Sequence, residues 1–141
     1  MAKITDPGVQ ELLAGPNYAV LSSHNADNTM HSTVVWIDYA DGVLAVNSAV
    51  GRRWPANLDR DPRVTLVVVE CGNPNHFVEI EGSAQGRTDG AREHIDALAC
   101  KYIGEAYPWL APGEQRKTFV ITPRHVRYVQ QYLHHGRVAP T

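Results

Sequence analysis

The sequence MHSTVVWIDYADGVLAVNS, residues 30–48, decides the fold. Its two ends, Met30 to Asp38 and Val43 to Ser48, are rich in β-branched and aromatic residues, which favour extended strands. Between them lies Asp41-Gly42, a dipeptide that typically forms the tight turn of a hairpin. The stretch therefore predicts two antiparallel strands joined by a short turn.

Similar segments flank this hairpin on both sides. The further strands expected from apolar and β-branched runs bounded by turn residues are residues 18–23, 63–70, 76–84, 118–122 and 125–133. Thr122-Pro123 is expected to break the chain between the last two, because proline supplies no N–H group to a sheet. Together these segments give six or seven short strands.

Only one long helix is expected, from Thr88 to Ile103, with Thr88 or Asp89 as its N-cap and Gly104 as its end. A short helix after Asp6-Pro7 and a helical turn within residues 51–60 complete the set. Because the helices do not alternate with strands, a doubly wound sheet is disfavoured. We expect a mainly β (α+β) fold in which residues 1–141 form one antiparallel barrel domain with a few short helices.

The composition excludes several classes of protein. With 43% hydrophobic and 20% charged residues, the 141-residue chain is typical of a soluble globular domain. Its 13 Lys and Arg against 15 Asp and Glu give a net charge of -2, which disfavours a general nucleic-acid-binding protein. No segment approaches the roughly 20 apolar residues of a membrane helix, and the N-terminus lacks the apolar run of a signal peptide. Two cysteines cannot form a disulfide framework, so we expect a cytoplasmic protein.

Residues 47–54, NSAVGRRW, form the most informative candidate binding segment. A strand ends in the polar pair Asn47 and Ser48, Gly51 permits a turn, and Arg52 and Arg53 open a helical segment. Hydroxyl groups, backbone N–H groups at a helix N-terminus and guanidinium groups are the components of a phosphate site. The alternative interpretation is a solvated surface loop, and the segment is not a P-loop, because GxxxxGK[ST] is absent.

The strand HSTVVW, residues 31–36, offers a surface against which a flat ring could lie, although it is equally a good barrel strand. Trp36 and Trp54 either stack on a ligand or fill the core. The seven histidines show neither HExxH nor a His/Cys spacing typical of zinc, and GxSxG is absent. No metal site and no catalytic side chain are therefore expected.

Taken in order, MHSTVVW (30–36), VLAVNSAVGRRWPANLDRDPRVTLVVV (43–69) and FVEIEGSAQ (77–85) resemble the pyridoxamine 5'-phosphate oxidase-like flavin and deazaflavin proteins, which have a split β-barrel fold. The most specific piece is NLDRDPRV, residues 57–64, which matches that family's NL-x-x-DPRV run. The similarity is greatest to the branch that uses the deazaflavin coenzyme F420. It covers nearly the whole chain, from the opening helix to His125-Val126.

The resemblance implies a cofactor site with four parts. Strand residues 32–36 would hold the ring system through their backbone, the polar pair at 47–48 would lie beside the ring and the ribityl chain, the arginine pair would bind the phosphate, and residue 57 would support that loop. The residues concerned are Ser32, Thr33, Val34, Val35, Trp36, Asn47, Ser48, Arg52, Arg53 and Asn57. Trp54 and Pro55 depart from the family's usual loop, which often has a lysine at the first of these positions.

The resemblance also implies a function. The chain would be a homodimer with its cofactor sites at the interface, and it would transfer a hydride from reduced F420 to an electron-poor small molecule such as an enone, a quinone or a tetrapyrrole. An FMN-dependent oxidase or reductase of the same family is the first alternative. A non-catalytic cofactor-binding or carrier protein is the second.

Overall fold

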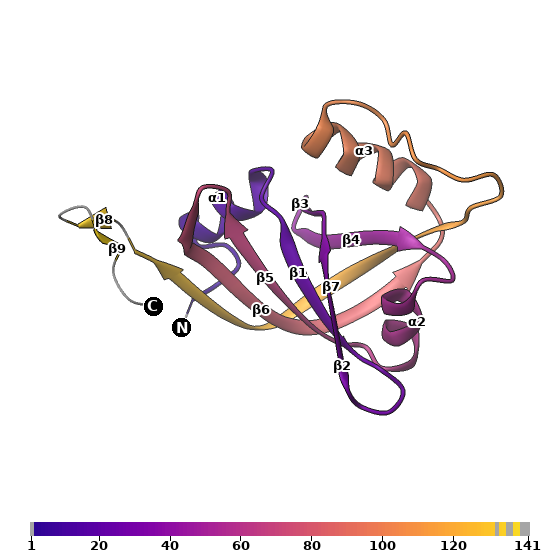
Figure 1. Ribbon diagram of the computed structural model, residues 1–141, viewed down its shortest axis with the longest axis horizontal. Coiled ribbons are helices and arrows are strands. Elements are labelled where there is room, and N and C mark those ends of the chain that lie inside the picture. Colours follow the sequence, from indigo (N-terminus) through magenta and orange to yellow (C-terminus); the bar gives the residue numbers. More distant parts are fainter. Residues whose placement is uncertain (1, 132, 135–136, 139–141) are drawn as a thin grey trace.

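The computed structural model of the chain describes residues 2–131, 133–134 and 137–138 (Figure 1). One antiparallel sheet has the strand order β2-β1-β5-β6-β7-β4-β3. Its strands are β1 (Ala19–His24), β2 (Met30–Val35), β3 (Ile37–Ala40), β4 (Val43–Ala49), β5 (Arg63–Glu70), β6 (Asn73–Arg87) and β7 (Arg116–Gln130). The helices are α1 (Pro7–Ala14), α2 (Arg53–Arg60) and α3 (Ala91–Ile103), and β8 (Leu133–His134) pairs with β9 (Arg137–Val138). The predicted mainly β barrel with a few short helices is confirmed as a curled half-barrel.

The strand predicted at residues 30–38 is divided at Trp36, so its prediction as one continuous strand is wrong. β2 pairs with β1 at one end of the sheet, whereas β3 pairs with β4 at the other end. The inward side chains continue through the bend, since Val35 and Ile37 are both buried. Two consecutive segments thus form the two outermost strands, and the bend between them brings the ends of the sheet toward each other.

The predicted break at Thr122-Pro123 is also wrong, because β7 runs from Arg116 to Gln130 without interruption. The sheet accommodates the proline with a bulge: Gly82 of β6 pairs with Pro123, whereas the preceding residue, Glu81, pairs with His125, so Arg124 is left between the two pairs. β4 pairs with β7 only as far as Ile121, short of Pro123. Proline therefore lies where β7 has a neighbouring strand on one side only, a position that a residue without an N–H group tolerates. The strand predicted at residues 125–133 ends earlier, at Gln130, and residue 131 is already outside it; residue 132 is not among the described residues.

Each helix buries one apolar face against the half-barrel. α1 buries Val9, Leu12 and Leu13, the face predicted from the sequence, and α2 buries Leu58. α3 packs on β4 and β7 and ends at Gly104, as predicted. Its N-cap is Gly90 rather than Thr88 or Asp89, and Gly90 has a φ of 73°, a left-handed conformation that favours glycine.

The outward face of β1 and β2 carries exposed apolar side chains. Val20 of β1 lies opposite Val34 of β2, and Tyr18 and Met30 extend the same surface, which we call the β1–β2 apolar face. Val34 is 64% exposed. Exposed apolar residues gathered on neighbouring strands indicate a surface that another molecule covers.

Candidate functional site

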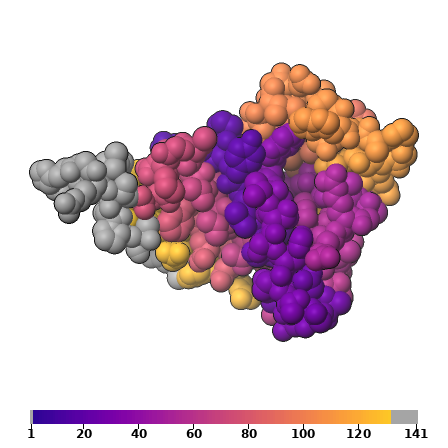
Figure 2. Space-filling view, viewed as in Figure 1, coloured from indigo at the N-terminus to yellow at the C-terminus, as the bar shows by residue number. Residues whose placement is uncertain are grey.

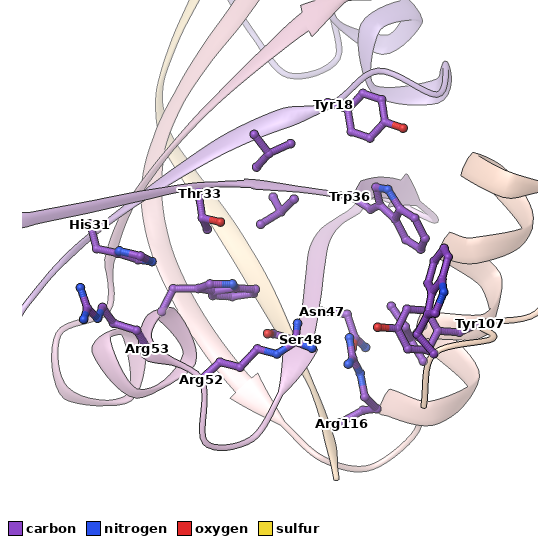
Figure 3. A pocket seen from close by; sticks show the side chains of 15 residues that line it. Tyr18, His31, Thr33, Trp36, Asn47, Ser48, Arg52, Arg53, Tyr107 and Arg116 are labelled. Carbon is purple, nitrogen blue, oxygen red and sulfur yellow. The ribbon is translucent and has the colours of Figure 1, made fainter. Parts of the chain in front are cut away.

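A cavity of about 440 Å³ lies between β2, β4, the start of α2, and α3 with the loop that follows it (Figure 3). Figure 2, which has the same view as Figure 1, shows α3 and its loop, in orange, above the strands and α2, in indigo to magenta. The lining residues are Tyr18, His31, Thr33, Val34, Val35, Trp36, Asn47, Ser48, Arg52, Arg53, Trp54, Ile95, Tyr107, Trp109 and Arg116. A cavity of this volume is in the range that holds cofactors and drug-sized ligands.

The charge of the cavity lining is entirely positive. Arg52, Arg53 and Arg116 line it, and no Asp or Glu is among the lining residues. The side chains of Arg52 and Arg53 are exposed and make no hydrogen bond or ion pair with another residue in the described part of the chain. They lie at the N-terminus of α2, whose first backbone N–H groups have no acceptor within the helix. This end of the cavity is therefore prepared to bind an anion.

Ser48 adds an unsatisfied polar atom to this wall. The residue is 1% exposed, and its Oγ has no hydrogen-bond partner among the described residues. Figure 3 places Ser48 next to Arg52. Because buried polar atoms are almost always hydrogen-bonded, a hydroxyl left without a partner at a cavity wall indicates a place for a polar atom of a ligand.

Asn47, in contrast, uses its amide within the protein. Its Nδ2 donates to the carbonyl oxygen of Ala91 at 2.9 Å, and its Oδ1 accepts a hydrogen bond from Nε of Arg116 at 3.0 Å. Arg116 also donates from Nη1 to Glu114 Oε2 at 2.9 Å. The structure thus places Asn47 at the cavity, where its hydrogen bonds hold Arg116 in position.

His94 belongs to the same hydrogen-bonded network. Because Arg116 can only donate, the amide oxygen of Asn47 faces Arg116 and its Nδ2 faces Nδ1 of His94 at 3.1 Å. Nδ1 of His94 also lies 3.0 Å from Thr118 Oγ1, and its Nε2 lies 3.2 Å from Asp38 Oδ1. His94 of α3 therefore connects Asp38 of β3 to Asn47 of β4.

The backbone of β2 is accessible on one side. β2 is the end strand of the sheet and pairs only with β1, so its other edge carries N–H and C=O groups that no described strand uses. Of the predicted residues on this strand, Thr33 and Val35 are on the inward face, and the exposed Val34 also borders the cavity. The strand can therefore offer backbone hydrogen bonds to a ligand.

Two of the predicted residues lie outside the cavity lining. The hydroxyl of Ser32 is 2.8 Å from that of Ser22 on β1. Asn57 is buried in α2, where its Nδ2 donates to Ser23 Oγ and to Asn25 Oδ1. Asn57 thereby ties the helix that carries Arg52 and Arg53 to the end of β1.

A row of aromatic rings forms the other end of the cavity. Trp36 stacks on Tyr102 with ring centroids 5.2 Å apart, and Tyr107 contacts Trp36 and Trp109 edge to face. The guanidinium carbon of Arg116 lies 4.9 Å from the ring centre of Tyr107. The sequence indicated the loop from Tyr107 to Gly113 as a place for substrate specificity, but Tyr107, Trp109 and Arg116 were not among the candidate site residues.

Trp54 has a structural position as well as a place in the lining. It is 6% exposed and packs against Phe119 of the core, with the two ring centroids 5.6 Å apart.

Within the described ranges, no group of three His, Cys, Asp or Glu residues could hold a metal ion. None of the described helices is long and apolar enough to span a bilayer.

Comparison with known proteins identifies the fold and the family. A family model described as pyridoxamine 5'-phosphate oxidase matches residues 5–130. The chain belongs to the pyridoxamine 5'-phosphate oxidase family. Proteins with this fold bind flavin-type cofactors, and members of the family are generally oxidoreductases and often dimeric. A sequence comparison with curated proteins finds no match.

Solved structures of low sequence identity share the split β-barrel of this family. A protein titled F420 reductase is 23% identical with a TM-score of 0.75, covering 84% of this chain and 94% of its own. The conserved hypothetical protein Rv2991 from Mycobacterium tuberculosis is 18% identical with a TM-score of 0.70, covering 92% and 85%. A putative pyridoxamine 5'-phosphate oxidase from Listeria innocua is 19% identical with a TM-score of 0.60, covering 79% and 86%. At these identities the similarity concerns the fold.

Proposed function

We propose that the chain is a reductase that uses coenzyme F420 to reduce an electron-poor small molecule. The observation that carries this proposal is the arginine pair at the start of α2. Arg52 and Arg53 have no partner within the described part of the chain and border a cavity whose lining contains no acidic residue. Unpaired guanidinium groups in such a place match the phosphate and acidic tail of this coenzyme. The structural similarity to a protein titled F420 reductase supports the same choice.

The chain's residues fit such a cofactor in three ways. Arg52, Arg53 and the N-terminus of α2 bind the phosphate, and the unsatisfied hydroxyl of Ser48 donates to an oxygen near it. The open edge of β2 at Thr33 and Val35 supplies backbone hydrogen bonds to the polar edge of a ring system. These interactions orient the ring within the cavity and exclude water from one of its sides.

The cofactor, when bound in its reduced form, would supply a hydride, which is two electrons and one proton, and water would supply the second proton of the reduced product. The residues of this chain bind and orient, and we assign no catalytic acid or base among them.

FMN is the second candidate cofactor. The family model that matches the chain is that of pyridoxamine 5'-phosphate oxidase, and FMN shares a tricyclic ring and a ribityl phosphate with the deazaflavin. The same arginine pair and the same edge of β2 would serve both cofactors. The two candidates therefore differ in measurable affinity rather than in the position of the site.

We propose that a second copy of the chain covers the β1–β2 apolar face. Tyr18 and Val34 belong to this face and also border the cavity. A protomer packed on β1 and β2 would bury the apolar side chains and would also close the cavity mouth beside Val34. The proposed dimer thus contributes a wall to each cofactor site.

The test is a parallel titration of the purified protein with F420 and FMN, followed by fluorescence and absorbance. We expect F420 to bind with micromolar or tighter affinity. The double variant Arg52→Gln, Arg53→Gln should lose about 2–4 kcal/mol of binding free energy, roughly 30-fold or more in affinity, through its lost charged hydrogen bonds. A variant with Lys3→Gln and Arg124→Gln removes the same charge from exposed positions outside the cavity and should bind normally.

The other outcomes separate the candidates. A yellow protein that releases FMN on denaturation and binds it more tightly than F420 would identify the flavin as the cofactor. Tight F420 binding with no transfer to a panel of enones, quinones and tetrapyrroles would indicate a carrier. Unchanged affinity in the double arginine variant would contradict the position of the site.

A further inference from the structure

The aromatic end of the cavity is fixed before any ligand binds. Trp36 is held by its stacking on Tyr102, with an interplanar angle of 5°. The backbone N–H of Tyr107 donates to Asp96 Oδ1 of α3 at 3.0 Å, which anchors the loop that carries Tyr107 and Trp109. Trp109 is 62% exposed, so its ring is available for contact. Rigid aromatic surfaces of this kind bind flat molecules at a low cost in conformational entropy.

Arg116 places a positively charged side chain at the aromatic end, in addition to the arginine pair at the start of α2. Its side chain is 3% exposed and is held by Asn47 through Nε and by Glu114 through Nη1. Its Nη2 has no hydrogen-bond partner in the described part of the chain, and the residue lines the cavity. In Figure 3, Arg116 and Tyr107 lie together on the side of the cavity opposite Arg53 and His31.

From these contacts we infer that the cavity has a second subsite, formed by Trp36, Tyr107, Trp109 and Arg116, for a planar conjugated carboxylate. The rings contact the flat part of the ligand, and Nη2 of Arg116 donates to its carboxylate oxygen. The inference deepens the proposed function, because this ligand is then the hydride acceptor. An α,β-unsaturated acid has a β-carbon that can accept the hydride, and water supplies the proton to the adjacent α-carbon.

The separation of positive groups supports this division of the cavity. Arg52 and Arg53 are placed to bind one anion at the start of α2. Arg116 is fixed beside Tyr107 by hydrogen bonds that extend through Asn47 to His94, so its side chain cannot move toward a ligand at the other end. Within the described part of the chain, the cavity therefore has the unpaired guanidinium groups of Arg52 and Arg53 at one end and, at the other, the free Nη2 of Arg116, whose charge Glu114 partly balances. With no carboxylate in the lining, it suits two ligands that each carry an anionic group.

The test uses three probes with the protein free of cofactor: naphthalene-2-carboxylate, its neutral amide, and cyclohexanecarboxylate, each measured by equilibrium dialysis. We expect the flat acid to bind at least about tenfold more tightly than either control. Arg116→Lys should remove the preference for acid over amide. Trp109→Ala, an exposed substitution that spares the fold, should weaken the binding of the flat acid and of its amide to the same degree. Thermal melts of both variants check that they are folded.

The outcomes distinguish the subsite from the proposed cofactor. Equal binding of acid and amide, or loss of acid binding in the Arg52→Gln, Arg53→Gln variant alone, would overturn the subsite even if F420 binds. Failure of F420 and FMN to bind, with the acid preference intact, would overturn the proposed function and leave the subsite standing. In the loaded enzyme, a conjugated acid should have a lower KM than its methyl ester, and Arg116→Lys should remove that difference.

Discussion

At the scale of single residues, Tyr102 shows how one hydroxyl holds the cavity wall. Its Oη donates to the carbonyl oxygen of Asn17 at 2.6 Å and accepts a hydrogen bond from the backbone N–H of Ile37 at 3.2 Å. Its ring supports Trp36. Burial raises the pKa of Tyr102 to about 12. The residue therefore links α3, β3 and the start of β1 as long as it keeps its proton.

Tyr102→Phe keeps the ring and removes these hydrogen bonds, so we expect it to lower the free energy of unfolding by about 1–2 kcal/mol at pH 7. Because the folded pKa is the higher one, the unfolded state releases its proton first, and the hydroxyl's contribution is complete below pH 10 and lost between about pH 10 and 12. The difference between the two proteins should shrink over that interval in urea unfolding. A difference in the free energy of unfolding between the two proteins that stays constant from about pH 8 to pH 11.5 would contradict this role.

Site residues that are close in sequence could be predicted from the sequence, whereas those that the fold brings together could not. Arg52 and Arg53 form a local signal with Gly51 and the start of a helix, and the structure places both at the cavity. Arg116 lies 69 positions from Asn47 and reaches the same cavity because β7 pairs with β4. No local pattern contains such a pairing, so this half of the site required the structure.

At the scale of elements, the bulge between β6 and β7 explains why a proline inside a strand did not end it. Gly82 lies opposite Pro123, and a Cβ atom at Gly82 would clash with the carbonyl oxygen of Thr122. From the sequence, Pro123 by itself predicts the end of a strand. The glycine that permits the bulge is about 40 positions earlier, so the compensation is not visible from either residue alone.

We expect Gly82→Ala to lower the free energy of unfolding by about 1–3 kcal/mol, because the added methyl group would push against backbone that cannot rotate away. The neighbouring exposed residue gives a matched control, and Ser83→Ala should change stability by less than about 0.5 kcal/mol. Denaturant unfolding of the two variants and of the parent protein measures both changes in the free energy of unfolding. Equal stability of the two variants would show that the bulge is more adaptable than its geometry implies.

At the scale of the whole molecule, the β1–β2 apolar face predicts assembly. Val34→Asp puts a charge at the centre of the proposed contact on an exposed side chain, so the subunit should keep its fold while the dimer dissociates. Val43→Asp makes the same change at the other end of the sheet and should leave the dimer intact. Size-exclusion chromatography with light scattering reads both masses. A parent protein that is monomeric at tens of micromolar would refute the proposed interface.

The same comparison should separate assembly from binding. If a second protomer closes the cavity mouth, Val20→Asp, which lies on the same face but outside the cavity lining, should dissociate the dimer and weaken cofactor affinity in proportion, and raising the protein concentration should restore the affinity. Val43→Asp should show neither effect. The overall barrel was predictable from strand patterns. The proposed surface between two copies was not, because it depends on which strands end the sheet, and that follows from the bend at Trp36.

That bend also limits how the length of the chain can change. His31, Thr33, Val35, Ile37 and Tyr39 keep one inward alternation across it, although they belong to strands at opposite ends of the sheet. One residue inserted or deleted at position 36 would turn the inward side chains of β2 or of β3 toward solvent. A change in length should therefore be tolerated better in an exposed turn such as Asp41-Gly42 than at position 36.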